Sequence, residues 1–388
     1  SQDKTPICRG GSIRVQDEKG NERTIRLVRI HMEEDSGKSI HDQDPFNTLV
    51  DLNRAGVPLL EIVTEPDFRS STEAYNYLTE VRRLVRYLDI CDGNMEEGSL
   101  RCDANISVRL KGASEFGRKV EVKNMNSIRN VQRAIEHEIR RQIDLIEAGE
   151  TIHQDTRSFD AASGTTSSMR SKEDAHDYRY FPEPDLQPIR VSQEYIDRIA
   201  QDMPPLPKEL FAKYTGELGL SDYDAGVLTD SKEIALYFEE VIANTSDYKA
   251  AANWVMGDVK SYLNQQGIHI DEFPVKPARI AELIGIIKEG IVSNSVASQK
   301  IFPALIAEPE THPKEIAEKN NWVQESNEDL ILSLVKEAIE SNPQQVAKYK
   351  DGNKGMVGFF MGQVMKKSQG KADPKAANQL VIKLLEEA

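Results

Sequence analysis

The chain has 388 residues, a formal net charge of −15 and 39% hydrophobic residues. This length is enough for about two or three domains, and the hydrophobic content is sufficient for packed cores, which excludes a disordered chain. The charge argues against a protein that binds nucleic acid over its whole surface. It does not exclude a local basic patch, because salt screens surface fields beyond about 10 Å.

Signals for a membrane or for export are not found in the sequence. There is no run of about 18 apolar residues, and the opening SQDKTPICRGG has no apolar signal-peptide core. Cys8, Cys91 and Cys102 form no CxxC pair and have no metal-binding spacing. Three scattered thiols are typical of a reduced cytosol, so we expect a cytoplasmic protein.

Strand patterns dominate the first half of the chain. They are TIRLVRIHMEED from Thr24, PLLEIVTE from Pro58, RCDANISVR from Arg101 and RKVEVKN from Arg118. The last two alternate between apolar and polar residues, as half-buried strands do. Because strands outnumber βαβ units and one face of each is polar, we expect a largely antiparallel sheet with one covered face.

Two amphipathic helices are predicted among these strands. Their apolar residues recur at helical spacing: Tyr77, Leu78, Val81, Leu84, Val85 and Leu88 in the first, and Ile128, Val131, Ile135, Ile139, Ile143 and Ile146 in the second. Ser70 and Glu73 have the spacing of a capping box at the start of the first helix. Gly149 is placed to end the second.

After MPPLP at residues 203–207, nearly all of the sequence is typical of a helical bundle. Turns are expected at ESNP and KADP, near residues 340 and 371. The predicted domains are residues 1–203, 204–310 and 311–388. The last 48 residues carry eight lysines against four acids, so this end of the chain is locally basic.

Carboxylates gather where the first long strand ends, in HMEEDSGK at residues 31–38. If the strand continues, Glu34 lies on its apolar face and Glu33 lies with His31 on the other. Grouped carboxylate oxygens suit Mg²⁺. An isolated run of this kind is more often a solvated turn.

Glu61 and Glu65 interrupt the apolar strand pattern PLLEIVTE. Alternation puts both on the face of Leu59 and Val63. A carboxylate is costly in an apolar setting, so these glutamates either face water on an edge strand or meet a cation. The segment alone leaves both interpretations open.

Asp103 and Glu121 lie in the middle of two alternating strands, near Lys123. An ordinary amphipathic sheet with cross-strand charge pairs would explain one such strand. Acids that recur at mid-strand positions repel one another unless a metal ion or basic groups lie between them. We therefore favour a functional face.

The segment MRSKEDAHDYRYFPEPD at residues 169–185 combines Arg170 and Arg179 with aromatic residues. Such a set can hold phosphates or stack on a base, or it can be a charged surface loop. The signatures of phosphate loops, dinucleotide folds, zinc proteases and serine hydrolases are absent from the sequence. SGTTSSM lacks a base and an oxyanion arrangement, so we do not expect serine hydrolase chemistry.

Taken together, these segments resemble the B subunits of the tRNA-dependent amidotransferases (GatB of GatCAB). DLNRAGVPLLEIV matches the family's signature stretch. HMEEDSGK, GSLRCDANISVR, KVEVKNMNS, MRSKEDAHDYRYFPEPDL and AANWVMGD resemble further family segments in the same order, over nearly the whole chain. Family members begin with a further segment that carries a Glu–His pair of the metal site. The resemblance therefore implies that the chain lacks the usual N-terminal segment.

The resemblance implies an α+β fold, in which a largely antiparallel, glutamine-synthetase-like cradle sheet with helices precedes an all-α helical domain and a small helical tail domain that binds tRNA. It implies a carbon–nitrogen ligase with glutamine as the amide-nitrogen donor, in a cytoplasmic heterotrimer with a glutaminase partner (GatA) and a small third partner (GatC). With ATP and Mg²⁺, a protein of this family phosphorylates the side-chain carboxylate of Glu-tRNA(Gln) or Asp-tRNA(Asn). Ammonia released by the glutaminase then displaces the phosphate.

Strand faces and family motifs together give the candidate site residues. The candidate metal ligands are Glu34, Glu61, Asp103 and Glu121, followed by Glu33 and Glu65. The candidate catalytic residues, which would hold phosphate, are Lys123, Arg170 and Arg179. The candidate tRNA-binding residues are Lys350, Lys354, Lys366 and Lys367, because lysines suit a phosphate backbone.

Two alternatives differ in kind from this enzyme. Without the usual N-terminal ligands, the chain would be a non-catalytic scaffold that binds tRNA and assembles the complex. A stand-alone ligase related to glutamine synthetase would instead act on free glutamate without tRNA. The basic helical tail argues against that second alternative.

Overall fold

The structure, a computed structural model, describes residues 5–40, 43–44, 46–169, 187–324, 328–368 and 372–387. Two compact units are found, Ser1–Pro204 and Pro205–Ala388. Strands occur in the first unit and helices fill the second, so the mixed α+β organisation predicted from the sequence is confirmed. The domain boundaries predicted at 203 and 310 and the glutamine-synthetase-like cradle stay predictions.

The strands of the first unit form two four-stranded sheets and a two-stranded ribbon among the described residues. They are β1 (Cys8–Arg9), β2 (Ser12–Gln16), β3 (Glu22–Glu34), β4 (Lys38–Ile40), β5 (Leu49–Asp51), β6 (Pro58–Thr64), β7 (Ala104–Ile106), β8 (Val120–Lys123), β9 (Asp155–Asp160) and β10 (Thr165–Ser168). In the first sheet, β3 pairs with β1, β2 and β6. The second sheet has the order β10-β9-β8-β7, and β4 pairs with β5.

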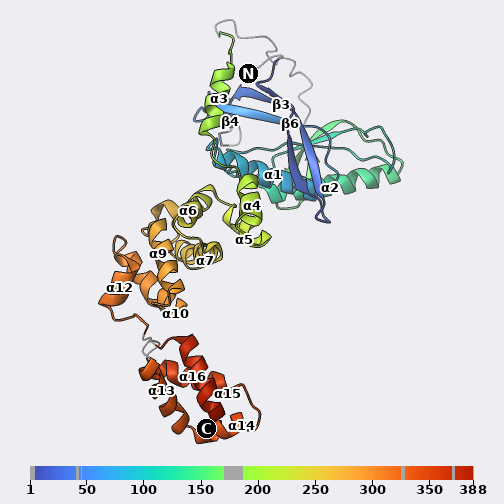
Figure 1. Cartoon of the computed structure of the whole chain (residues 1–388). Helices are drawn as coiled ribbons and strands as arrows, with labels where there is room; N and C mark the ends of the chain where they lie inside the picture. The colour runs from blue at the N-terminus through green and yellow to red at the C-terminus, as the bar shows by residue number, and fades with distance from the viewer. Residues whose placement is uncertain are drawn as a thin grey trace. The chain divides into compact units, whose positions relative to one another are not determined.

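Pairing is antiparallel throughout these sheets except between β8 and β9, which are parallel. The expectation of a largely antiparallel arrangement is therefore confirmed. The long strand β3 serves two partners, because its first half pairs with β2 and its second half with β6. β3 and β6 run next to each other, with α1 and α2 side by side beneath the sheets (Figure 1).

Helices α1 (Ser71–Tyr87) and α2 (Ile128–Glu147) hold the two sheets together. One hydrophobic core contains residues from both sheets and both helices, including Ile25, Tyr77, Val122 and Val131. Each fully buried aliphatic side chain stabilises the fold by about 1.5–3 kcal/mol. The carboxylate-bearing strands are thus fixed to one packed body.

The predicted helix ends are confirmed. Ser70 caps α1 by accepting a hydrogen bond from the Glu73 amide at 3.2 Å. The Glu73 carboxylate reaches one residue further back than a standard capping box and accepts from the Arg69 amide at 2.7 Å. Gly149 follows α2 with a φ of 79°, the left-handed conformation that glycine adopts at helix ends.

The apolar stripe predicted for α2 is only partly the buried one. Ile143 and Ile146 are 40% and 47% exposed, whereas Glu138 and Gln142 are fully buried. The Glu138 carboxylate accepts hydrogen bonds from Arg141, Gln142 and Thr166, so the second half of α2 buries a polar network against β10. A buried charge is tolerated when it is paired and hydrogen-bonded in this way.

Helix α3 (Gln193–Asp202) ends the first unit, and the second unit is helical. Its elements are α4 (Pro207–Gly216), α5 (Asp222–Leu228), α6 (Lys232–Ile242), α7 (Tyr248–Trp254), η1 (Val255–Val259), α8 (Lys260–Gln266), η2 (Ile270–Glu272), α9 (Pro277–Lys288), α10 (Asn294–Val296), η3 (Ala297–Ile301), α11 (Phe302–Ala307), α12 (Pro313–Lys319), α13 (Glu328–Glu340), α14 (Pro343–Lys350), α15 (Met356–Lys367) and α16 (Pro374–Glu387). The turns expected at ESNP and KADP separate α13 from α14 and α15 from α16.

Helices α13 to α16 share a hydrophobic core of their own, which includes Tyr349, Phe360 and Val381. Met356, Phe359 and Met361 pack against this core. Across the described parts of the chain, no helix has the length and apolar character needed to cross a membrane.

Candidate functional site

Glu61 lies beside His31 and Glu33 in the first sheet. The register of β3 and β6 places Glu61 directly opposite His31, and cross-strand partners share a face. Ligand atoms of His31, Glu33 and Glu61 all lie within 4.8 Å of one another. Two carboxylates and an imidazole at this spacing form a donor set for a divalent cation.

A positively charged side chain, Arg29, already lies beside the Glu61 carboxylate. Oε2 of Glu61 lies 3.6 Å from Nη2 of Arg29 and 3.7 Å from Nδ1 of His31. Nε of Arg29 in turn donates to Nδ1 of His31 at 3.4 Å. The sequence left open whether Glu61 faces water or meets a cation. In this structure a cation from the neighbouring strand β3, the guanidinium of Arg29, lies beside it.

Glu34 and Glu65 do not join this group. Glu34 pairs with Pro58, and successive side chains alternate between the faces of a strand, so Glu34 points away from the face of Glu33. Glu65 follows the end of β6, and its amide donates to the Arg26 carbonyl at 2.9 Å. The structure thus brings Glu61 together with Glu33, and not with Glu34.

Asp103, Glu121 and Lys123 form a second group, on the other sheet. Nζ of Lys123 lies 2.6 Å from Oδ2 of Asp103 and 3.4 Å from Oε1 of Glu121. Partial burial opposes the lysine charge, but the hydrogen bond to Asp103 and the charges of both carboxylates outweigh it, and the pKa of Lys123 is raised. An ammonium group, rather than a vacant space, therefore separates these two predicted metal ligands.

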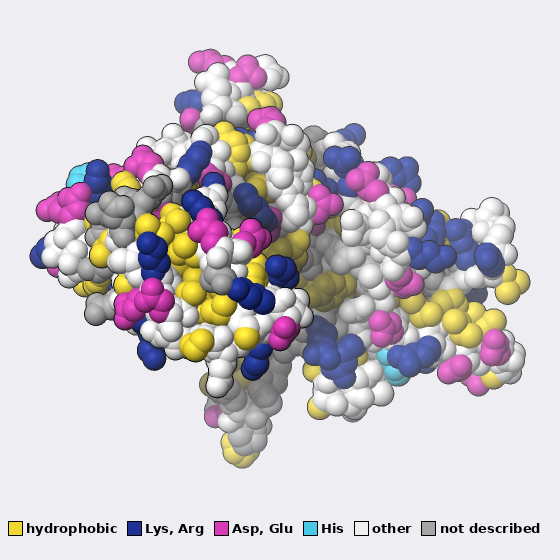
Figure 2. All heavy atoms as spheres, turned by 60° about the horizontal axis from the view of Figure 1, so that its bottom comes forward, with side chains coloured by type: hydrophobic (Ala, Val, Ile, Leu, Met, Phe, Trp, Pro, Cys, Tyr) yellow, Lys and Arg dark blue, Asp and Glu magenta, His cyan; other side chains and the backbone are white. Residues whose placement is uncertain are grey.

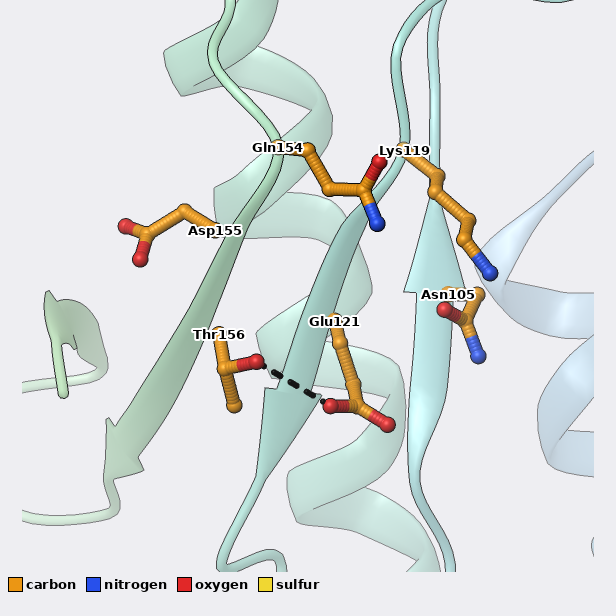
Figure 3. A pocket seen from close by; sticks show the side chains of 6 residues that line it. All are labelled: Asn105, Lys119, Glu121, Gln154, Asp155 and Thr156. Atoms are coloured by element: carbon orange, nitrogen blue, oxygen red, sulfur yellow. Dashed lines mark hydrogen bonds between the residues drawn. The ribbon is translucent and has the colours of Figure 1, made fainter. Parts of the chain in front are cut away.

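A small polar pocket adjoins Glu121 (Figure 3). Its lining residues are Asn105, Lys119, Glu121, Gln154, Asp155 and Thr156. Glu121 and Thr156 point toward one another from neighbouring strands, and the Thr156 hydroxyl donates to Glu121 at 3.2 Å, whereas Asp155 points away. The volume of about 110 Å³ is below the roughly 300 Å³ of typical small-molecule sites, so this pocket alone does not enclose a nucleotide.

A buried carboxylate, Asp35, connects three of the sequence segments described above. Its side chain is 5% exposed and accepts from Nε of Arg54 at 2.9 Å and from Nη2 of Arg101 at 2.5 Å. Arg54 also donates to the carbonyls of Glu97 and Gly98, at 2.8 and 2.9 Å. Burial opposes ionisation of Asp35, but the hydrogen bonds from Arg101 and Arg54 outweigh it and the pKa is lowered.

The other candidates fall in two places. Arg170 and Arg179 lie outside the described residues. Lys350, Lys366 and Lys367 are exposed on helices α14 and α15, and Lys354 is exposed in the turn between them, as lysines that contact a polyanion must be. Nζ of Lys354 lies 4.1 Å from the centre of the Tyr349 ring.

Lys367 is not free of intramolecular contacts, since its Nζ lies 2.7 Å from Oε1 of Glu337. On the face drawn in Figure 2, Lys and Arg side chains lie among Asp and Glu side chains and exposed hydrophobic ones. The positive charge of the tail is therefore partly balanced at Lys367, by Glu337.

Sequence reasoning did not select His31, Asp35, Arg54, Arg101 or Thr156 as site residues. His31 carried a signal, because alternation places it with Glu33. Asp35 belongs to the grouped acids of HMEEDSGK, but the sequence gave no signal for its pairing with Arg54 and Arg101, since the two arginines lie 19 and 66 residues from Asp35 in the chain and meet it only in the fold.

These observations define a class of protein in which an α+β unit is followed by an all-helical unit. The α+β unit presents a carboxylate–histidine group, formed by His31, Glu33 and Glu61, and a lysine–carboxylate group, formed by Asp103, Glu121 and Lys123. Family models agree with both units: one described as "GatB/GatE catalytic domain" matches residues 1–197, and one described as "GatB domain" matches residues 236–385.

Curated relatives match nearly the whole chain. The B subunit of an aspartyl/glutamyl-tRNA(Asn/Gln) amidotransferase from Chlorobium limicola is 50% identical over 98% of this chain and 79% of its own length. Proteins of the same name from Thermodesulfovibrio yellowstonii and Trichodesmium erythraeum are 46% and 49% identical over 100% of the chain and 81% and 80% of their own lengths. The chain belongs to the family of aspartyl/glutamyl-tRNA(Asn/Gln) amidotransferase B subunits.

Proposed function

We propose that this chain is the component of a tRNA-dependent amidotransferase that activates the amino acid on a misacylated tRNA. It uses ATP to phosphorylate the side-chain carboxylate of Glu-tRNA(Gln), Asp-tRNA(Asn) or both. Ammonia from the glutaminase partner GatA then displaces the phosphate, with the small partner GatC completing the complex. The observation that carries the proposal is the 50% identity with a B subunit of such an enzyme over 98% of the chain.

The chemistry explains why no nucleophilic side chain is required. A carboxylate is a poor electrophile until one of its oxygens becomes a good leaving group, and phosphorylation supplies that group. Catalysis of phosphoryl transfer depends mainly on positioning and on positive charge near the transferring group. Carboxylates, a histidine and basic side chains on a rigid sheet suit this task.

Among the residues that the structure describes, His31, Glu33 and Glu61 fit a divalent cation best, because their ligand atoms already lie within 4.8 Å of one another. Mg²⁺ bound there would offset charge on phosphate oxygens. Arg29, whose guanidinium lies 3.6 Å from the Glu61 carboxylate, helps to hold that carboxylate in its position on the sheet. Glu34 is a weaker candidate ligand, because it lies on the opposite side of β3.

Lys123 is the described residue that suits a phosphate contact on the second sheet. Its raised pKa keeps the ammonium charged at neutral pH, and a lysine acts on phosphate as a point charge. In the absence of substrate, the ammonium group of Lys123 forms ion pairs with Asp103 and Glu121, which hold it in place. Arg170 and Arg179 remain proposed phosphate contacts, and the four tail lysines remain proposed contacts to the tRNA backbone.

The test is reconstitution of this chain with GatA and GatC, followed by assays of Gln-tRNA formation and of ATP hydrolysis that depends on Glu-tRNA(Gln). Glu61→Gln removes one charge from the carboxylate group without changing the size of the side chain. We expect loss of amidation, while glutaminase activity and tRNA binding are kept. Glu115→Gln, at an exposed loop position, is the matched control and keeps all three activities.

Two results would contradict the proposal in different ways. If the wild-type complex binds tRNA but hydrolyses no ATP in response to it, the chain is a tRNA-binding scaffold. If the wild-type complex is active and Glu61→Gln retains full amidation, Glu61 has a structural role only.

A further inference from the structure

We infer that Asp35, together with Arg54 and Arg101, is a positioning group for the amidation reaction. It fixes the carboxylate–histidine group of the first sheet relative to the lysine–carboxylate group of the second. The inference rests on the proposed function, because it assumes that the two groups act on one substrate.

The positions along the chain support this role. Asp35 follows the end of β3 and comes two residues after Glu33. Arg101 comes two residues before Asp103, which binds Lys123. The 2.5 Å contact between Arg101 and Asp35 therefore joins the end of one group to the beginning of the other.

Arg54 adds a second connection between the same parts of the fold. It lies in the turn between β5 and β6, shortly before the strand that carries Glu61. While it binds Asp35, its guanidinium also donates to the carbonyls of Glu97 and Gly98, in the segment that leads to β7. Charge-assisted hydrogen bonds to a planar guanidinium have well-defined geometry, so both connections are directional.

The backbone is shaped to receive these arginines. Gly98 has a φ of 79°, which other residues rarely adopt, and a Cβ at this position would lie 3.2 Å from Nη1 of Arg54 and 3.6 Å from Nε of Arg101. Both guanidinium groups thus approach the main chain at a glycine. This close approach indicates an arrangement in which the position of the arginines matters.

The different exposure of Asp35 and Arg101 allows an experiment to distinguish a positioning role from a structural role in the core. Asp35 is 5% exposed, whereas Arg101 is 59% exposed. Replacing Arg101 removes little packing and leaves Asp35 paired with Arg54, so the fold is kept while the connection to Asp103 is lost. A misplacement of about 1 Å at a reacting centre lowers a rate about 100-fold.

The test measures kcat and KM of amidation in the reconstituted complex for Arg101→Gln, Arg101→Lys and Asp35→Asn, beside thermal unfolding and glutaminase activity. For Arg101→Gln we expect kcat to fall about 10- to 100-fold, with KM for ATP and for Glu-tRNA(Gln), glutaminase activity and unfolding temperature unchanged. Arg101→Lys, which keeps the charge, restores part of kcat. Asp35→Asn shows at least the loss seen with Arg101→Gln.

The control is Asp224→Asn. Asp224 is 7% exposed and pairs with Lys249 in the helical unit, so it matches Asp35 in burial and in pairing but not in location. We expect it to lower stability and to leave kcat unchanged.

Three results would overturn the inference. The first is a wild-type kcat in Arg101→Gln. The second is a loss that appears in KM for ATP alone, which would make Arg101 a binding residue. The third is a loss of activity in Arg101→Gln or Asp35→Asn that a decrease in unfolding temperature fully accounts for, with Asp224→Asn losing as much activity for the same decrease. A wild-type complex that lacks amidation refutes the proposed function itself, and the variants are not needed to show it.

Discussion

The fully buried carboxylate of Glu138 gives the sharpest test of how the first unit is stabilised. Arg141 donates to it twice, at 2.9 and 2.6 Å, and Gln142 and Thr166 donate at 2.9 and 3.2 Å. Arg157 lies 3.7 Å away, from β9. Glu138→Gln keeps the size of the side chain and removes the charge that these groups surround.

The expected loss follows from the exposure of the partners. Removing one member of a buried ion pair costs about 3–5 kcal/mol, because the remaining charge is left uncompensated. Arg141 is 24% exposed, so water compensates part of its charge and we expect the lower end, about 3 kcal/mol. For a unit of this size, about 2–4 °C per kcal/mol gives a decrease in Tm of about 6–12 °C.

The pH dependence follows from the pKa of Glu138. Burial opposes ionisation, but hydrogen bonds from Arg141, Gln142 and Thr166 outweigh it, and the pKa is lowered. A lowered folded-state pKa means that the stabilisation is complete above the unfolded-state pKa and is lost as pH falls through the folded-state value. The difference in free energy of unfolding between the wild type and Glu138→Gln therefore becomes smaller below about pH 4.

Thermal unfolding followed by circular dichroism measures the effect. Both tryptophans, Trp254 and Trp322, belong to the second unit, so their fluorescence is an internal reference that the substitution leaves unchanged. Glu22→Gln is the matched control, because its pair with Arg14 is exposed by 63% and 57% and such pairs contribute at most about 1 kcal/mol. Equal Tm values for the two variants would refute the reasoning.

Two further predictions concern Gly98, which lies against Arg54 and Arg101, and the lysines of the tail. Gly98→Ala should destabilise the chain more than Gly20→Ala and should also lower kcat. Both glycines have a φ near 80°, so alanine costs about 1–2 kcal/mol of backbone strain at either position. Only at Gly98 would the added Cβ also come close to Arg54. Equal stability and kcat in the two alanine variants would contradict this. In titrations of tRNA at several salt concentrations, Lys366→Ala should weaken binding and reduce the salt slope by about 0.7–0.9. Lys367→Ala should do so less, because that lysine must first leave an acidic partner, and an unchanged slope in both would remove these lysines from the interface.

The strand faces were predictable from the sequence because alternation is a local property. Val120 and Val122 are completely buried, while Lys119, Glu121 and Lys123 alternate with them, as predicted. The strand length was overestimated for RCDANISVR, since β7 covers only Ala104–Ile106. A periodic pattern indicates which side faces the core, but hydrogen bonding to a neighbour decides how far the strand extends.

The second helix shows where local periodicity fails. A stripe of isoleucines predicted the buried face of α2, yet the second half of this helix buries Glu138 and Gln142 and leaves Ile143 and Ile146 exposed. Arg157 and Thr166, from β9 and β10, supply the partners that make burial of Glu138 favourable. Those partners lie beyond the end of the helix in the chain, so its own sequence does not reveal them.

The candidate site depends on register, which is the least local property of all. Glu61 meets His31 and Glu33 because β6 pairs with β3 in one register. A slip by one residue would turn every side chain of β6 to the opposite face and would place Glu61 on the side of Glu34. Asp35 directly follows β3, and Arg54 comes shortly before β6, so their contact at 2.9 Å opposes such a slip. The group that we infer to position the two halves of the site therefore also stabilises the register that assembles the first half.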